Sequence, residues 1–144
     1  MNIEDVPQDR GMITKEHGRE VCYAVDEQGQ YTLSMSAGWD VKNIVNDQAW
    51  AVIIEDTKKC HELVIKGKKS PLVYFASKNQ MDMSLLSHYV DMAKWRVKRH
   101  CSPRVFGKLP TAILEKYAQV FGISIDQLKN IPKEFHPDQV VVSK

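Results

Sequence analysis

A short run of cationic and aromatic side chains between residues 93 and 100 is the part of the sequence best suited to a chemical task. It contains Lys94, Trp95, Arg96, Lys98 and Arg99. Ammonium and guanidinium groups donate hydrogen bonds to phosphate oxygens and to guanine acceptors, and an indole ring can contact a thymine methyl group or stack on an unpaired base. The run therefore predicts binding to a polyanion, with no chemical step.

The same run has the spacing of a short helix, Ala93–His100. On a helical wheel Ala93, Val97 and His100 lie on one side, and Trp95 and Arg99 lie on the opposite side. We expect His100 to be a packing residue. A helix with an aliphatic inner side and a cationic outer side suits the major groove of duplex DNA.

The stretch from Met81 to Val97 resembles the helix-turn-helix of the lambda-repressor/Cro family, the xenobiotic-response-element regulators. A capped helix supplies Leu86, a turn ends at Met92, and Val97 lies under the second helix. The resemblance covers roughly Pro71–Leu128 and implies a five-helix DNA-binding unit. The sequence departs from the family by having Met83 for a frequent Gln, Ser87 and Asp91 for the usual Ala and Gly, and a longer connection between Val97 and Pro110.

Carried over by position, this resemblance implies double-stranded DNA as the partner. It implies that Lys94, Trp95 and Arg99 face base edges. The phosphate contacts are then expected from Arg96, Lys98, Arg104 and Lys108.

Elements that must position this site can be read from the hydrophobic pattern. Residues 20–25 and 30–35 flank Asp26–Gly29 and predict a β-hairpin with Tyr31, Leu33 and Met35 on one face. A helix of about 20 residues is expected from Asn46 to about Lys66. Trp39, which follows a glycine between these two elements, is expected to plug the core beside the hairpin.

Further helices are predicted from their capping residues. Ser70 and Pro71 begin one helix, Asp82 caps the next, and Ser124 with Gln127 forms a capping box for the last. The fold class is therefore α+β, mainly α. We divide the chain into a loose arm (1–18), the hairpin with the long helix (19–69), the helix-turn-helix unit (70–130) and a tail (131–144) that is a stray strand or disordered.

Charge is distributed unevenly along the chain. Residues 1–57 hold 4 Lys/Arg and 11 Asp/Glu, whereas residues 58–108 hold 12 Lys/Arg and 3 Asp/Glu, and the whole chain has a net charge of +2. A middle segment this basic predicts an anionic partner, most simply nucleic acid phosphate.

Several classes of protein are disfavoured by what the sequence contains. The three cysteines are widely spaced and no pair of His or Cys has zinc-ligand spacing, so neither a disulfide framework nor a metal site is expected. Since glycine-rich phosphate loops and nucleophile motifs are also lacking, we expect no enzyme and no cofactor. No apolar stretch spans a bilayer and the first residues do not resemble a signal peptide, so we expect a cytoplasmic protein with no membrane partner.

The sequence thus predicts a small transcription regulator that binds duplex DNA as a homodimer joined through the N-terminal half. Two alternatives stay open. The helical unit could bind an acidic protein partner through its basic face, or the chain could bind single-stranded nucleic acid through Trp95.

Overall fold

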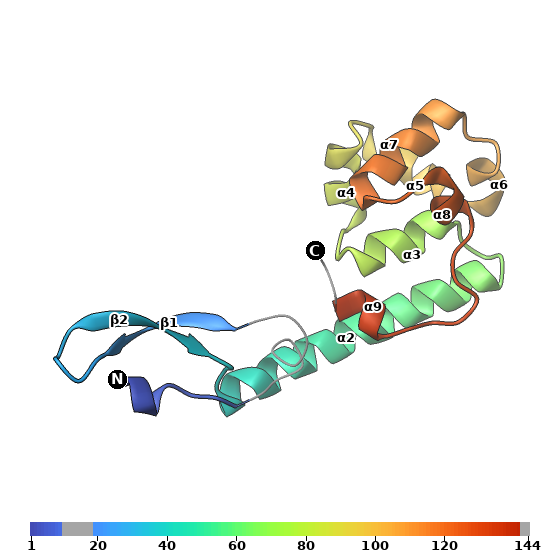
Figure 1. The fold of residues 1–144 in the computed structure, drawn as a ribbon. Helices are drawn as coiled ribbons and strands as arrows, with labels where there is room; N and C mark the ends of the chain where they lie inside the picture. The colour runs from blue at the N-terminus through green and yellow to red at the C-terminus, as the bar shows by residue number, and fades with distance from the viewer. Residues whose placement is uncertain (10–18, 142–144) are drawn as a thin grey trace. The chain divides into compact units, whose positions relative to one another are not determined.

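The computed structural model describes residues 1–9 and 19–141 and divides into two compact units, Met1–Val52 and Ile53–Lys144 (Figure 1). The predicted α+β, mainly α class is confirmed, because an antiparallel hairpin is followed by a long helix and several shorter ones. The division falls inside the long helix α2 (Asp40–Ile65), and not after Lys69 as we had placed it. The second half of α2 belongs with the helices because Val64 packs against their core.

The hairpin consists of β1 (Glu20–Val25) and β2 (Tyr31–Ser36) in antiparallel register. Asp26 closes the loop, because its carboxylate accepts hydrogen bonds from the backbone N–H groups of Gln28 (2.9 Å) and Gln30 (2.8 Å). Gly29 takes a left-handed φ of 78°, as the last residue of a three-residue hairpin loop requires. The predicted alternation is confirmed, and the face with Tyr31, Leu33 and Met35 is exposed.

Residues 1–9, which we call the strap, are not part of a loose arm. The Val25 N–H donates to the Met1 carbonyl (2.8 Å), and the Asp9 N–H donates to the Gly38 carbonyl (3.1 Å). The strap includes the 3₁₀ turn η1 (Ile3–Asp5). Its first residues pair with Val25 at the end of β1, and Gln8 pairs with Gly38 just after β2. The remainder of the predicted arm, residues 10–18, lies outside the described residues.

The long helix begins earlier than its hydrophobic period indicated. It starts at Asp40 instead of Asn46 and ends before Gly67, which has a left-handed φ of 69°. Trp39, directly before α2, is 59% exposed. The prediction that Trp39 plugs the core was therefore wrong; the chain enters the helix at that point and the indole is left at the surface.

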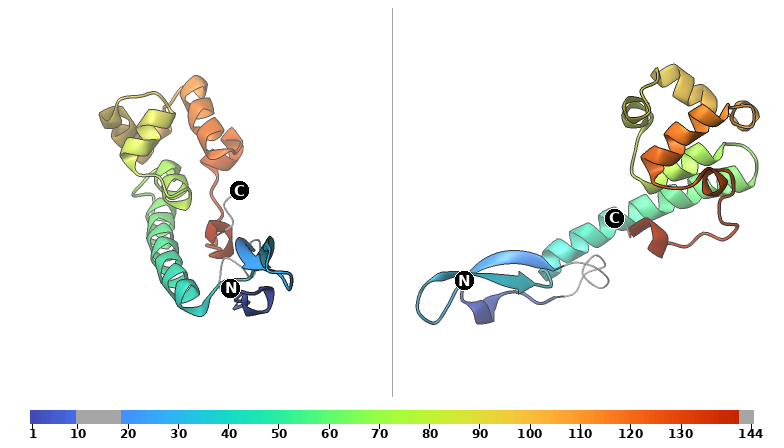
Figure 2. Two further views of the ribbon diagram at one scale, coloured as in Figure 1. Left: turned by 90° about the vertical axis from the view of Figure 1, so that its left-hand side faces the viewer. Right: turned by 45° about the horizontal axis from the view of Figure 1, so that its top comes forward.

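Unit Ile53–Lys144 is a cluster of short helices around one core (Figures 1 and 2). Its further elements are α3 (Pro71–Lys78), α4 (Met83–Tyr89), α5 (Lys94–His100), α6 (Pro103–Phe106), α7 (Thr111–Phe121), α8 (Ile125–Lys129) and α9 (Asp138–Val141). Helices α3, α7 and α8 contact one another, and Leu72, Tyr117 and Leu128 have no exposed surface. This arrangement gives α5 a closely packed support.

Two of these helices were not predicted. Helix α6 is a single turn in the connection that the sequence left irregular, and it buries Phe106 in the core. Helix α9 lies where we expected a strand or disorder. The Val140 N–H donates to the Pro137 carbonyl (2.9 Å), and the Val140 side chain is 1% exposed, so this part of the tail is an ordered turn of helix.

Candidate nucleic-acid interface

The candidate site is built on α4 and α5 and the tight turn between them. Asp91 takes a left-handed φ of 50°, where glycine is usually favoured. The Asp91 N–H donates to the His88 carbonyl (3.2 Å), and the Met92 N–H donates to the Ser87 carbonyl (3.1 Å). These are the two hydrogen bonds of a Schellman motif, and they end α4 sharply and reverse the chain into α5.

The inner side of α5 is fixed by two buried side chains. Val97 has no exposed surface and His100 is 6% exposed, as their positions on the wheel predicted. Ala93 is exposed, in contrast to our prediction. Its backbone is extended (φ −60°, ψ 136°), because it is the N-cap of α5 and not a member of the helix, so the helical wheel does not apply to it.

A buried hydrogen bond connects α5 to α7. His100 Nδ1 lies 2.8 Å from the Tyr117 hydroxyl, and the two rings meet edge to face. Burial, followed by the positive charges of Arg96 and Arg99, lowers the pKa of His100 from its ordinary 6.5. The imidazole is therefore neutral at pH 7, and its hydrogen bond with Tyr117 holds α5 without adding a buried charge.

The end of α5 is held by the residue that precedes α3. Ser70 is fully buried; its N–H donates to the Cys101 carbonyl (2.9 Å) and its hydroxyl donates to the His100 carbonyl (3.0 Å). Ser70 is the N-cap of α3 by its backbone, but its side chain makes no capping bond, so that part of the prediction was wrong. The hydroxyl instead satisfies a carbonyl at the C-terminal end of α5.

Cys101 is a further anchor behind α5. Its thiol is buried, donates to the Val97 carbonyl (3.4 Å) and lies 3.6 Å from the Met83 sulfur. Burial raises the pKa of Cys101, and Lys69 only partly opposes this. The thiol is therefore protonated at neutral pH and packs as a small apolar group.

The outer side of α5 is exposed and cationic. Trp95 is 65% exposed, and the side chains of Arg96, Lys98 and Arg99 are exposed as well. Trp95 and Arg99 are four residues apart and so lie on one face. Across residues 1–9 and 19–141, no carboxylate forms an ion pair with any predicted site cation; these are Lys94, Arg96, Lys98, Arg99, Arg104 and Lys108.

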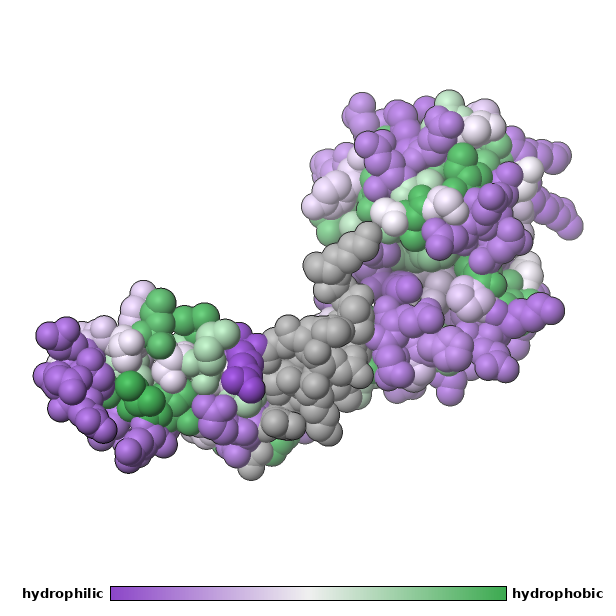
Figure 3. Space-filling model, in the orientation of Figure 1, coloured by the Kyte–Doolittle hydropathy of each residue, from purple (hydrophilic) through white to green (hydrophobic). Residues whose placement is uncertain are grey.

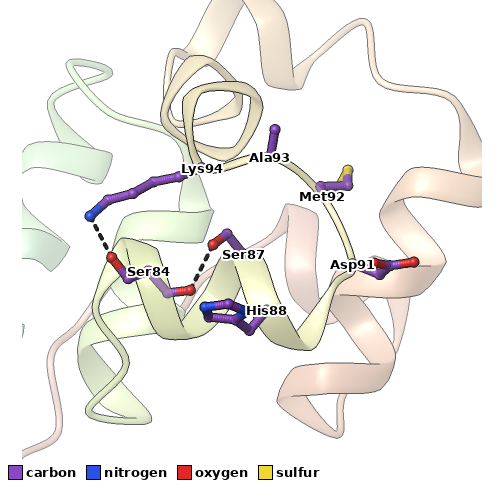
Figure 4. A pocket seen from close by; sticks show the side chains of 7 residues that line it. All are labelled: Ser84, Ser87, His88, Asp91, Met92, Ala93 and Lys94. Atoms are coloured by element: carbon purple, nitrogen blue, oxygen red, sulfur yellow. Dashed lines mark hydrogen bonds between the residues drawn. The ribbon is translucent and has the colours of Figure 1, made fainter.

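Lys94 reaches back toward α4 (Figure 4). Its ammonium group donates to the Ser84 hydroxyl, and the Ser87 hydroxyl donates to the Ser84 carbonyl (2.6 Å). Together with His88 and the turn residues, these side chains line a pocket of about 440 Å³ between the two helices. Lys94 therefore lies at the α4–α5 junction, whereas Trp95 and Arg99 lie on the face of α5 itself.

The last two predicted cations lie outside α5. Arg104 is on α6 and Lys108 follows it, and both are exposed. Helix α6 contacts α5, so Arg104 belongs to an element that adjoins the site. The contacts of the Ser84, Ser70 and Tyr117 hydroxyl groups could not be predicted, since a hydroxyl gives no signal in the sequence until the partner that it bonds is known.

Comparison of the chain with protein-family models, with curated proteins and with solved structures gave no significant match. In the part of the chain that the structure describes, no three His, Cys, Asp or Glu side chains are grouped so as to hold a metal ion. Among the same residues, no helix has both the length and the apolar character to cross a membrane.

Proposed function

We propose that the protein is a cytoplasmic, sequence-specific duplex-DNA-binding regulator that places α5 in the major groove. The observation that carries the proposal is that α5 has a buried inner side and an exposed, cationic outer side. Its inner side is fixed by Val97 and His100. Trp95 and the cations around it are exposed, and within residues 1–9 and 19–141 no carboxylate pairs with those cations. The likeness to the lambda-repressor/Cro helix-turn-helix supports the same function.

Dimensions agree with this use of α5. A helix with its side chains is about 10–12 Å in diameter, and the major groove is about 12 Å wide. Arg99 and Trp95 would then meet base edges. Lys98 and Arg96 on the flanks, and Arg104 and Lys108 beyond the helix, would meet phosphates.

The junction between α4 and α5 is the second part of the proposed interface. Lys94 and Ser84 place an ammonium group and a hydroxyl side by side at the pocket mouth. Both groups can donate to a phosphate oxygen. We therefore assign Lys94 to the phosphate backbone, which differs from its place by family resemblance, where it faces a base.

The decisive experiment is selection on random duplexes, followed by binding titrations at several salt concentrations. Arg99→Ala should weaken binding to the selected sequence by about 5- to 150-fold, because a base contact contributes about 1–3 kcal/mol. Lys98→Ala should weaken binding to all duplexes alike and lower the slope of log K against log salt by about one. Fluorescence anisotropy measures both effects.

Lys116→Ala is the matched control, since Lys116 is exposed on α7 and outside the site. It should leave the affinity and the salt slope close to wild type. If selection enriches no sequence, or if Lys116→Ala weakens binding as much as Arg99→Ala, the proposal is wrong. Binding of an acidic protein that duplex DNA fails to displace would favour the interaction-module alternative.

The exposed indole supports one second candidate, which is binding of single-stranded nucleic acid. Trp95 is 65% exposed, and base stacking on such a ring contributes about 1–3 kcal/mol per base. Trp95→Phe should retain this binding and Trp95→Ala should lose it. A preference for single strands over every duplex tested would favour this candidate.

A further inference from the structure

One face of the hairpin consists only of uncharged, mostly large apolar side chains. The register pairs Tyr23 with Leu33 at the centre of this face. Tyr23 is 73% exposed and Tyr31 is 81% exposed. We call this the apolar hairpin face; its members are Val21, Tyr23, Val25, Tyr31, Leu33 and Met35.

The strap covers the opposite face of the hairpin. Val6 of the strap is buried, Ala24 has no exposed surface, and the Ser36 hydroxyl donates to the Pro7 carbonyl (2.5 Å). The chain therefore covers the side of the sheet that carries small residues. On the side with the large residues, only Val25 is half-buried, next to Asn2 and Ile3 of the strap. The other five members are exposed, and green apolar atoms are seen at the surface of this unit in Figure 3.

Among its described residues, unit Met1–Val52 buries few apolar side chains. Its buried apolar side chains, among the residues described, are only Val6, Ala24 and Ala37. A two-stranded hairpin is marginal in water unless its hydrophobic face packs on something. A partner that covers the apolar hairpin face would supply what this unit lacks.

The size of the face matches a protein interface. Two tyrosine side chains of about 200 Å² each, three-quarters exposed, supply on the order of 300 Å². With the aliphatic and methionine side chains, the face exceeds the few hundred Å² of apolar patch usual on a monomer. It approaches the roughly 800 Å² per partner that a standard interface buries.

The net charge of residues 1–52 limits the kinds of partner that the apolar hairpin face can bind. Residues 1–52 hold 4 Lys/Arg and 9 Asp/Glu, which disfavours nucleic acid and anionic lipid. The face itself is uncharged; Glu20 alternates to the opposite face of β1, where its Oε1 pairs with Lys42 Nζ at 2.5 Å. An uncharged, regular face can pack on a copy of itself without bringing like charges together.

We propose that the apolar hairpin face binds the same face of a second copy of this chain. The two sheets pack face to face about 10 Å apart, and the two-fold axis passes near the Tyr23–Leu33 pair. Because the interface is two-fold symmetric, each large side chain contributes to it from both copies. The inference concerns the free protein, so it holds or fails independently of the DNA proposal.

The test is the molecular mass of the full chain in solution without DNA, by sedimentation equilibrium from about 1 to 100 µM, the range of ordinary protein association. The wild type should have twice the chain mass of 16.5 kDa. Leu33→Lys should raise the dimer dissociation constant on the order of 100-fold, because the lysine enters a two-fold interface twice. Gln28→Lys, with the same charge change in the exposed hairpin loop, should remain dimeric.

Amide hydrogen exchange separates dissociation from misfolding of the variant. In the wild type, exchange of the β1 and β2 amides should slow as the concentration rises, and in Leu33→Lys it should not. A wild-type chain that is monomeric at about 100 µM overturns the proposal. A dimer that Leu33→Lys leaves intact, or binding of neutral lipid vesicles in place of self-association, also overturns it.

Discussion

The buried hydrogen bond between His100 and Tyr117 joins α5 to α7. The imidazole lies under the cationic surface and is kept neutral by burial and by Arg96 and Arg99. A protonated His100 would place a third positive charge beside those two guanidinium groups. The pair therefore makes the packing of α5 sensitive to pH.

Stability should fall as the pH falls below about 6.5. Because the folded chain lowers the pKa of His100, the unfolded chain takes up the proton first, so protonation favours unfolding between 6.5 and the lower folded pKa. The slope from one proton is at most about 1.4 kcal/mol per pH unit. His100→Gln, which keeps a hydrogen-bonding group toward Tyr117, should remove this part of the slope in urea unfolding between pH 5 and pH 7.5.

His88→Gln is the control, because it makes the same substitution at an exposed position of α4. It should leave the dependence of the unfolding free energy on pH as in the wild type. If His88→Gln flattens the curve as much as His100→Gln, the pH dependence does not come from α5.

Several of the turns that follow helices contain a residue with a positive φ. Gly67, Gln80, Asp91 and Gly122 all have positive φ, and each follows the last turn of a helix. Glycine takes this conformation freely, whereas a residue with a Cβ atom is strained there. The chain therefore carries strain at Gln80 and at Asp91, on either side of α4.

Replacing Asp91 tests how much the turn between α4 and α5 lowers the free energy of unfolding. Asp91→Gly should raise the free energy of unfolding by up to about 1 kcal/mol, and Asp91→Val should lower it by about 1–2 kcal/mol, because the β-branched side chain clashes in this conformation. Chemical denaturation of the two variants measures the difference.

Gln119→Gly, exposed within α7, should instead lower the free energy of unfolding by about 1 kcal/mol, since glycine disfavours a helix interior. Equal signs for Asp91→Gly and Gln119→Gly would contradict the strain assigned to Asp91.

Most elements could be predicted from the sequence because their signals are local. The loop with Gly29, the cap Asp82 and the capping box of Ser124 and Gln127 depend on residues within five positions, and the structure has all three. Helix α6 depends on Phe106 reaching a core assembled from distant segments. No local pattern reports such a contact.

The cations of the candidate site could be identified from the sequence, whereas the residues that hold α5 in place could not. The spacing of Val97 and Arg99 was enough to separate the inner from the outer side of α5. The placement of Lys94 on Ser84, and of Ser70 on the end of α5, joins segments 10 and 30 residues apart. Those contacts arise only when the helices pack.

Burial is distributed very unevenly over the whole chain. Every member of the main core cluster, from Val64 to Phe135, belongs to the unit Ile53–Lys144. The unit Met1–Val52 has acidic residues in excess and much exposed apolar surface. The two units should therefore differ in their ability to fold alone.

A fragment of residues 53–144 should unfold in one cooperative transition and keep native helical circular dichroism, because it retains the whole cluster. A fragment of residues 1–52 at low concentration should lack the fixed structure of a folded domain. Thermal unfolding of each fragment, beside the full chain, measures this. A cooperative transition of the monomeric 1–52 fragment would show that this unit has enough core of its own.

Chemical labelling of the Cys101 thiol can report whether α5 is packed. It is enclosed by Val97 and Met83 and is protonated at neutral pH, so a thiol reagent reaches it only when α5 leaves its packed position. Cys22 and Cys60 are partly accessible. The rate of labelling at Cys101 therefore measures how often α5 detaches from its packed position, and a bound partner that holds the helix in place would slow that rate.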